Sequence, residues 1–356
     1  MSLFKATKPL IHSLNPEKAH NAAISLLKKN LVPSQACFSH SNLESTLLGL
    51  TFKHPVGLAA GFDKNAEAIP ALLNQGFSFV EAGTVTPLAQ DGNEKPRLFR
   101  LENDEAIINR MGFNNKGISE FQKNIKKAKL KKSNSIIGAN IGKNKNSPND
   151  ASDYITLLDK IYGESDYITI NISSPNTPNL RQLQKKETLE DLLKDITGKK
   201  TQLRENTQKN IPILLKIAPD IDSEDCKDIV EAVKKYNIDG IIVSNTTISR
   251  PESLSNKYKN EQGGLSGKPL FDISTETLRE IYKLSNGTIP LIGVGGIFTG
   301  EDAYKKIKAG ASIVQIYSCL IYEGFEVINQ INKELSELLE KDGFTNIQEA
   351  IGSDQI

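Results

Sequence analysis

Short apolar runs recur along the chain from residue 56 onward, and most of them are followed by a charged stretch with helical spacing. Eight runs stand out, at residues 56–61, 77–84, 135–142, 167–174, 212–220, 240–247, 290–297 and 312–318. They are continuously apolar rather than alternating, which is typical of buried parallel strands. Residues 222–236, 301–311 and 324–341 have the spacing of amphipathic helices. The pattern predicts an α/β fold, a (β/α)8 TIM barrel, with a doubly wound open sheet as the alternative.

Two insertions interrupt this alternation. Residues 47–56, ahead of the first run, predict a hairpin that closes the floor of the barrel. Residues 96–115 predict a second hairpin, with segments 98–101 and 106–109 turning at 102–104. Because the second hairpin leaves the carboxyl end of a strand, we expect it on the face that carries the active site.

The first 40 residues form a region that we separate from a catalytic barrel of residues 41–356. Apolar residues recur there at helical spacing, and Asn15-Pro16 fits an N-cap followed by proline at the first helical position. The first thirty residues carry five lysines against one acid, Glu17. The pattern predicts two short amphipathic helices with basic flanks. They form either a cap on the core, which the residues alone favour, or a surface that touches a membrane.

The composition is that of a globular protein and narrows the chemistry. The 356 residues are 38% hydrophobic and 24% charged with a formal net charge of +1, which argues against nucleic-acid binding. Cys37, Cys226 and Cys319 lie far apart, which favours a reducing compartment without disulfides or a structural zinc site. All four histidines fall within the first 54 residues, so catalysis further along has no histidine base. We expect no transmembrane segment and no signal peptide.

Polar residues gather at the carboxyl ends of the predicted strands, where barrel enzymes carry their sites. This set contains two lysines, several amides and hydroxyls and a glycine pair: Lys64, Thr84, Asn140, Asn171, Ser174, Lys216, Ser244, Asn245, Thr246, Gly295, Gly296, Tyr317 and Ser318. It holds no cluster of carboxylates. Such a mouth suits a polar, anionic ligand and no divalent metal.

Two features of this mouth point to an anionic ligand. Gly295 and Gly296 stand between a strand and a helix, where backbone N–H groups can hold a phosphate, and residues 263–269 offer a second glycine turn. The alternative for each of these two glycine segments is a tight turn without a ligand. Lys216 lies among apolar residues on a strand, and a buried lysine needs an anionic partner. Lys64 alone could equally be a solvated residue after a turn.

Ser174 is harder to interpret from the residues. No histidine stands near it to activate the hydroxyl, and serine before proline is usually a turn residue. It nevertheless lies in a loop suited to closing over a ligand, and residues 179–184 have the reach of a lid. On physical grounds alone Ser174 remains a turn residue.

A series of motifs in this order resembles one family. The motifs are GLAAGFDKNAE, VEAGTVTP, PRLFR, NRMGFNN, IGANIGKNK, NISSPNTPNLR, LLKIAPD, SNTT, GGLSGKPL and IGVGGI. They resemble the dihydroorotate dehydrogenases, specifically the membrane-associated, quinone-using class 2 enzymes, over nearly the whole chain from residue 45. Soluble class 1 relatives typically have cysteine where this chain has Ser174. Asn179 stands where the family often has glycine, with little expected consequence because asparagine tolerates left-handed geometry.

The resemblance implies a barrel that oxidises (S)-dihydroorotate to orotate in pyrimidine (UMP) biosynthesis, with FMN as the hydride acceptor. The implied flavin-binding residues are Ala60, Gly61, Phe62, Asp63, Lys64, Thr84, Asn140, Asn171, Lys216, Ser244, Gly267, Gly296, Tyr317 and Ser318. The implied substrate-binding residues are Lys64, Asn109, Arg110, Met111, Gly112, Phe113, Asn171, Asn176, Asn245 and Thr246. Ser174 takes the position of the catalytic base.

In that scheme, Ser174 removes the C5 proton while a hydride leaves C6, with Thr177 and water as candidates for the proton path. Lys216 stabilises the reduced flavin and Lys64 the substrate carboxylate. The N-terminal helices become the mouth through which a membrane quinone, the final electron acceptor, reaches the flavin. The expected protein is a monomer, peripheral on the cytoplasmic side of a bacterial inner membrane.

Three other functions stay open at this point. A dihydrouridine synthase should bring a basic RNA-binding surface, and a class 1 dehydrogenase should lack the N-terminal pair and have cysteine at position 174. A non-enzymatic phosphate-binding barrel that docks through its N-terminal helices would be colourless when purified.

Overall fold

The computed structural model describes residues 3–132 and 134–355. Eight parallel strands close into a barrel in which each strand pairs with the next along the chain and the last pairs with the first. These strands are β3 (Val56–Leu58), β4 (Phe79–Val85), β7 (Ile136–Ile141), β8 (Tyr167–Asn171), β9 (Ile213–Ile217), β10 (Gly240–Val243), β12 (Leu291–Val294) and β13 (Ile313–Ile316). They fall in the eight apolar runs, so the predicted (β/α)8 barrel is confirmed and the open sheet is excluded.

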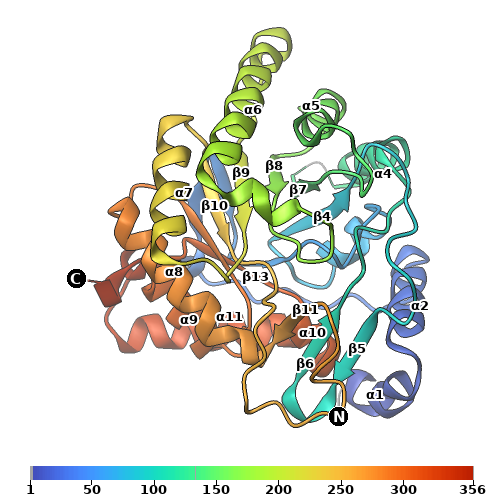
Figure 1. The fold of residues 1–356 in the computed structure, drawn as a ribbon. Helices are drawn as coiled ribbons and strands as arrows, with labels where there is room; N and C mark the ends of the chain where they lie inside the picture. The colour runs from blue at the N-terminus through green and yellow to red at the C-terminus, as the bar shows by residue number, and fades with distance from the viewer. Residues whose placement is uncertain (1–2, 133, 356) are drawn as a thin grey trace.

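Helices surround the barrel (Figure 1). They are α3 (Ile69–Leu73), α4 (Ile118–Lys131), α5 (Asp150–Ile161), α6 (Lys186–Thr207), α7 (Ser223–Lys235), α8 (Phe271–Ser285), α9 (Gly300–Lys308), α10 (Ser318–Glu323) and α11 (Val327–Lys341). The helices predicted at 222–236, 301–311 and 324–341 are α7, α9 and α11. Short 3-10 turns lie at Ser41–Leu43, Glu102–Asp104, Leu180–Gln184, Lys268–Leu270, Ile347–Ala350 and Ser353–Gln355.

The floor of the barrel is filled and closed by aromatic side chains. Phe79 and Tyr167 are buried inside it, and each occupies the space that a side chain at a glycine on the neighbouring strand would need, Gly57 and Gly138 respectively. The hairpin of β1 (Ser45–Leu47) and β2 (Leu50–Phe52) packs Phe52 edge-on against Phe79 with ring centroids 5.2 Å apart. The predicted floor-closing hairpin is therefore confirmed, and the described aromatic side chains fill the barrel at this end.

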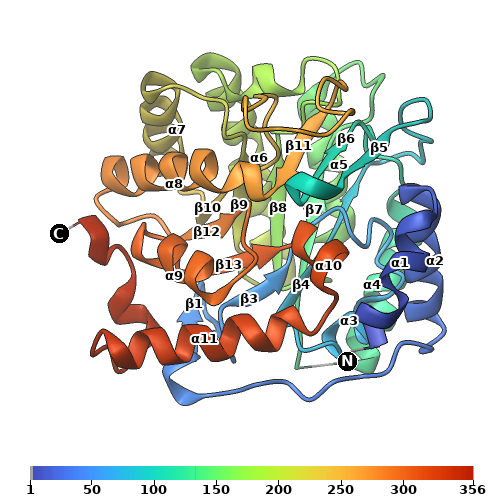
Figure 2. The ribbon, with the colours of Figure 1, turned by 90° about the horizontal axis from the view of Figure 1, so that it is seen from below.

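The second predicted hairpin is also present. Strands β5 (Leu98–Leu101) and β6 (Ala106–Asn109) pair antiparallel and turn at residues 102–104. A third strand, β11 (Gly264–Gly267), which the sequence pattern did not predict, pairs with β6. This three-stranded sheet lies over the carboxyl ends of the barrel strands (Figure 2).

Two N-terminal helices lie beside this sheet at one side of the molecule (Figures 1 and 2). They are α1 (Leu3–Ser13) and α2 (Pro16–Lys28), and Asn15 caps α2 by accepting hydrogen bonds from the N–H groups of Glu17 and Lys18. The helix pair is thus where the spacing predicted it, while the division of the chain at residue 40 stays a prediction. None of the described helices combines the length and apolar composition that crossing a bilayer requires.

Candidate active site

One continuous cavity of about 780 Å³ extends from the carboxyl ends of the barrel strands to the N-terminal helices. Most of the residues singled out from the sequence line it: Ala60, Gly61, Phe62, Lys64, Thr84, Asn109, Met111, Gly112, Phe113, Asn171, Ser174, Asn176, Lys216, Ser244, Asn245, Thr246, Gly267, Gly296, Tyr317 and Ser318. The barrel thus brings residues from seven of its eight strand ends to one site, the end of β7 being the exception.

Three predicted site residues lie outside the lining. Asn140 is buried beneath it, and Asp63 is buried behind the loop that carries Lys64. Arg110 turns away to pair with Glu261 at 2.7 Å. Asn140 and Asp63 therefore act on the lining from behind, and a direct substrate contact by Arg110 stays a prediction.

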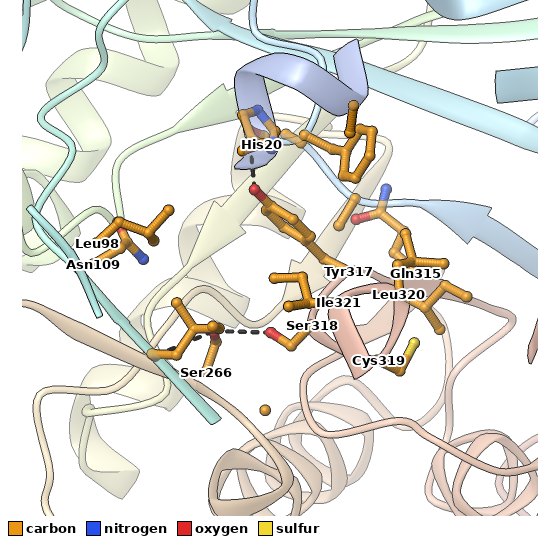
Figure 3. A pocket seen from close by; sticks show the side chains of 18 of the residues that line it. His20, Leu98, Asn109, Ser266, Gln315, Tyr317, Ser318, Cys319, Leu320 and Ile321 are labelled. Carbon is orange, nitrogen blue, oxygen red and sulfur yellow. Dashed lines mark hydrogen bonds between the residues drawn. The ribbon is translucent and has the colours of Figure 1, made fainter. Parts of the chain in front are cut away.

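The cavity has two chemically different ends. Its inner end carries the amides, hydroxyls and lysines of the strand ends, whereas its outer end is lined by apolar side chains of α1 and α2, among them Leu10, Ile11, Ala23 and Leu26. In the close-up, Tyr317 points toward His20 on α2, and so stands between the two ends (Figure 3). A polar molecule and an apolar molecule can therefore approach the same interior from opposite sides.

A buried carboxylate lies under the inner end. Glu81, on β4, is fully buried, and its carboxylate is 3.9 Å from the ammonium of Lys216 on β9. Its oxygens accept hydrogen bonds from four side chains: Asn140 (2.8 Å), Gln315 (2.9 Å), Tyr167 (3.1 Å) and Thr169 (3.1 Å). Burial lowers the pKa of Lys216, and the charge of Glu81 opposes that effect. Glu81 therefore helps to keep a cation at the inner end of the cavity.

Glu81 also sets the direction of a chain of amides. Because a carboxylate only accepts hydrogen bonds, Asn140 turns its Nδ2 toward Glu81 and its Oδ1 toward Asn171. Asn171 donates to that oxygen, while its own Oδ1 accepts from Asn245 at 3.4 Å. The donor and acceptor edges that face the cavity are thus set from the interior of the barrel.

The loop after β3 positions Lys64. The buried Asp63 carboxylate accepts hydrogen bonds from the N–H groups of Glu67 (2.8 Å) and Ala68 (2.7 Å), which holds this loop against the start of α3. Burial raises the pKa of Asp63 to about 6. Lys64 is half-buried and lines the cavity, and burial lowers its pKa to about 8. It therefore carries a positive charge at neutral pH.

Ser174 lines the cavity in the loop after β8. It is buried, and its hydroxyl oxygen accepts a hydrogen bond from the N–H of Asn176 at 3.3 Å. Arg181 holds this loop in place, because it donates to the carbonyl oxygens of Ser173 and Thr246 and pairs with Asp220 at 2.8 Å. Sequence reasoning missed the role of Arg181, whose partners are far away in the chain.

The glycine turns are as tight as the sequence suggested. Gly295 and Gly296 have φ values of 115° and 74°, which favour glycine. A side chain at Gly296 would collide with the backbone of Phe271 at the start of α8. Opposite them, Ser318 donates a hydrogen bond to Ser266 on β11 at 2.9 Å (Figure 3). Glycine turn, hydroxyls and the N-terminus of a helix together suit an anionic group.

The donors and acceptors of the cavity fit a flavin that carries a phosphate. Lys64, Lys216 and Arg100 give it a cationic lining, against one acid, Glu326. The buried Oε1 of Gln315 lines it without a hydrogen-bond partner among the described residues. Within that same part of the chain, no group of three or more metal-ligating side chains is present.

An eight-stranded barrel with a cationic, amide-lined cavity at the carboxyl ends of its strands defines the protein as a (β/α)8 enzyme of a polar, anionic substrate. Comparison with known proteins specifies it further. A family model described as dihydroorotate dehydrogenase matches residues 42–339. The chain therefore belongs to the dihydroorotate dehydrogenase family and is an oxidoreductase.

Individual relatives agree along the whole chain. The dihydroorotate dehydrogenase (quinone) of Xanthobacter autotrophicus is 46% identical over 355 residues, with 99% of each protein covered. The mitochondrial dihydroorotate dehydrogenase (quinone) of Mus musculus is 46% identical over 347 residues, covering 96% of this chain and 87% of that protein. The crystal structure of the Eimeria tenella enzyme in complex with ferulenol has a TM-score of 0.92 at 40% identity, covering 97% of this chain and 99% of that one. These relatives assign the chain to the quinone-dependent class 2 of the family, and the other functions left open by the sequence are thereby excluded.

Proposed function

We propose that the chain oxidises (S)-dihydroorotate to orotate with FMN bound at the inner end of the cavity, Ser174 as the base and a membrane quinone as the final acceptor. The observation that carries this proposal is the single cavity that joins polar strand ends to the apolar faces of α1 and α2. FMN supplies a ring that takes up a hydride from one molecule and passes electrons to another. One protein can then serve a polar donor and an apolar acceptor.

Different residues of the chain bind the substrate, orient it and take its proton. Lys64 binds the carboxylate of dihydroorotate, and the amides of Asn171 and Asn245 orient its ring. Ser174 Oγ takes the proton from C5 as the hydride leaves C6, and the hydroxyl's own proton passes on to solvent along a path for which Thr177 and water are the candidates. The buried position of Ser174 excludes bulk water from this transfer. Lys216 places a positive charge where negative charge develops, and Glu81 and Asn140 hold the neighbouring amides in one orientation.

The test uses anaerobic mixing of the flavin-loaded protein with dihydroorotate, followed by flavin absorbance. Rapid bleaching is expected in the wild type, and Ser174→Ala should slow it by about 10²- to 10⁴-fold, the usual contribution of a positioned base. Ser174→Cys is the matched control, because a thiol at the same position can still take the proton. Bleaching that is unaffected by Ser174→Ala would return this residue to a role in the turn. No bleaching in the wild type would overturn the reaction itself.

The outer end of the cavity supports a contact with the membrane. Leu10, Leu14, Leu26 and Leu31 are exposed on or next to α1 and α2, and several lysines flank them, which suits an anionic lipid surface. We place the protein on the cytoplasmic side of a bacterial inner membrane, where it supplies orotate for UMP synthesis as a monomer. Leu10→Asp and Leu26→Asp together should abolish co-sedimentation with anionic vesicles while dihydroorotate still bleaches the flavin. Unchanged co-sedimentation would argue against this surface.

A further inference from the structure

A second buried lysine lies outside the cavity and has no role in the proposed reaction. Lys306, on α9, is fully buried. Its ammonium donates to the hydroxyl of Ser274 at 2.6 Å and to the carbonyl oxygen of Phe271 at 3.5 Å. It also lies 5.1 Å from the centroid of the Phe271 ring. A buried charge is costly unless an opposite charge compensates it.

No carboxylate among the described residues forms an ion pair with Lys306 within 4.0 Å. Asp272 and Asp302 act on it only at longer range, and Arg279 opposes them. Burial lowers the pKa of its ammonium well below the ordinary value. The position therefore lacks the anion that would balance it.

The Gly295–Gly296 turn, next to the residues that Lys306 contacts, is a place where such an anion could bind. Ser274 Oγ, which accepts from Lys306, lies 3.3 Å from the carbonyl oxygen of Gly295. A side chain at Gly295 would meet that same hydroxyl at 2.7 Å, and one at Gly296 would meet Phe271 Cα at 2.5 Å. The Gly295–Gly296 turn thus rests on the two residues that Lys306 contacts. One hydroxyl separates the buried ammonium from the turn.

The aliphatic part of the Lys306 side chain lies close to Gly293 on β12. A Cβ at Gly293 on β12 would lie 3.4 Å from Lys306 Cβ and 3.5 Å from its Cδ. The side chain therefore runs along β12, two residues before the turn. Helix α8 begins beside the Gly295–Gly296 turn without a side-chain cap, and its Phe271 N–H donates to the carbonyl oxygen of Lys268. The positive end of the helix dipole therefore lies next to the turn, where it favours an anion.

We propose that Lys306 is a specificity-determining residue of the flavin site: its buried ammonium supports the Gly295–Gly296 turn from below and makes the site select a flavin with a phosphate over one without. This proposal rests on the proposed flavin function. Lys306 acts through the turn and through its charge, without touching the ligand, and so it is a positioning residue. The dianionic phosphate then balances the charge that the protein leaves unpaired.

The test compares FMN with riboflavin, which has the same ring and no phosphate. Flavin-depleted full-length protein is titrated with each, and flavin fluorescence is followed, since the chain contains no tryptophan to interfere. The wild type should prefer FMN. In Lys306→Met, affinity for FMN should fall about tenfold or more, the scale of one lost charge interaction near a low-dielectric site, while affinity for riboflavin stays the same.

Lys216→Met is the matched control, because it removes the other buried lysine, at the end of the cavity where we place the flavin ring. It should weaken FMN and riboflavin alike and leave their ratio unchanged. Ser274→Ala keeps the ammonium but removes the hydroxyl between it and Gly295, so it should lower the preference for FMN by a smaller factor. This second variant also tests the proposal if Lys306→Met does not fold.

Equal losses for both flavins in Lys306→Met would show that the lysine only supports the scaffold, and unchanged affinities for both would show that its charge is irrelevant. Either result overturns the proposal while the flavin function stands. A wild type that binds FMN and riboflavin equally would also overturn it. A wild type that binds neither would instead overturn the proposed flavin function.

Discussion

The ion pair between Glu17 and Arg97 ties helix α2 to the start of β5. Arg97 Nη2 lies 2.7 Å from Glu17 Oε1, and Nε lies 3.2 Å from Oε2. The two side chains are only 7% and 10% exposed. Lys95 approaches the same carboxylate at 3.5 Å but is 68% exposed. Substitution of this pair therefore tests what holds the N-terminal helices on the barrel. Substitution of Lys95, an exposed partner of the same carboxylate, is the control.

Glu17→Gln keeps the shape of the side chain and removes its charge. Breaking a buried pair costs about 3–5 kcal/mol when the remaining charge is stranded. Arg97 is not wholly stranded, because its Nη1 donates to the carbonyl oxygens of Asp91 (2.6 Å) and Asn93 (2.8 Å). We therefore expect a loss of about 2 kcal/mol, in the range of a charge-assisted hydrogen bond. Lys95→Gln should cost under about 0.5 kcal/mol, as exposed pairs do.

The appropriate measurement is amide hydrogen exchange of residues 16–28 in the full-length protein, since α2 can open without unfolding the barrel. A loss of 2 kcal/mol corresponds to about 30-fold faster exchange. A double-mutant cycle of Glu17→Gln and Arg97→Gln should give a coupling of about 1.5–3 kcal/mol. A coupling below about 0.5 kcal/mol, or equal effects of Lys95→Gln and Glu17→Gln, would refute the assignment.

The same pair predicts a dependence on pH. Burial by itself raises the pKa of Glu17, but the hydrogen bond and charge of Arg97, with a smaller contribution from Lys95, lower it below 4.5. A carboxylate with a lowered pKa stabilises the fold above its unfolded value, and this contribution is lost as pH falls through the folded value. Protection of α2 should therefore decline below about pH 4.5 in the wild type, and Glu17→Gln should lack that component.

Three further predictions concern other charged groups. Because the pKa of Lys64 is about 8, orotate affinity measured by calorimetry should fall about tenfold per pH unit above that value, whereas Lys64→Met should give a flat profile. Glu81→Leu removes the acceptor of four buried hydrogen bonds and should lower the free energy of unfolding in urea by about 3–5 kcal/mol; a loss under about 1 kcal/mol would contradict this network. Burial lowers the pKa of His54 to about 4, and its two ring nitrogens already bond the Gly76 carbonyl and the Val56 N–H. The wild type should therefore lose about 1.4 kcal/mol per pH unit from pH 6.5 down to about 4, and an equal acid response in His54→Gln would contradict it.

The barrel could be predicted from the sequence because its signal is local and repeated. Each apolar run is buried on both faces, so the pattern within nine or fewer residues is enough to identify a strand. The strand ends could be predicted for the same reason, since closure of the barrel brings them together whatever their spacing in the chain. Strand β11 escaped prediction because its four residues, Gly264–Gly267, have no strand-like pattern. It forms only because the neighbouring β6 offers an edge to pair with.

Residues that act from behind the cavity could not be assigned in the same way. Arg181 and Asp220 are 39 positions apart, and nothing in either segment indicates that they meet. Lys306 lies on a helix with two other lysines, Lys305 and Lys308, and a lysine on such a helix is expected to face solvent. Its burial follows from how α9 sits against β12 and α8, which is information about packing rather than pattern.

Glu81 was visible in the sequence as an exception to the apolar pattern, but the sequence did not show what this exception meant. An acid in the apolar run 77–84 violates the pattern of a buried strand, and such a violation points to function or to a compensating partner. Only the closed barrel shows that Asn140, Gln315, Tyr167 and Lys216, from four other strands, converge on it. The acid is tolerated because these groups satisfy it. They in turn are oriented because a carboxylate accepts hydrogen bonds and does not donate them. The one acid in this apolar strand is thus the residue that gives the amides of the cavity their direction.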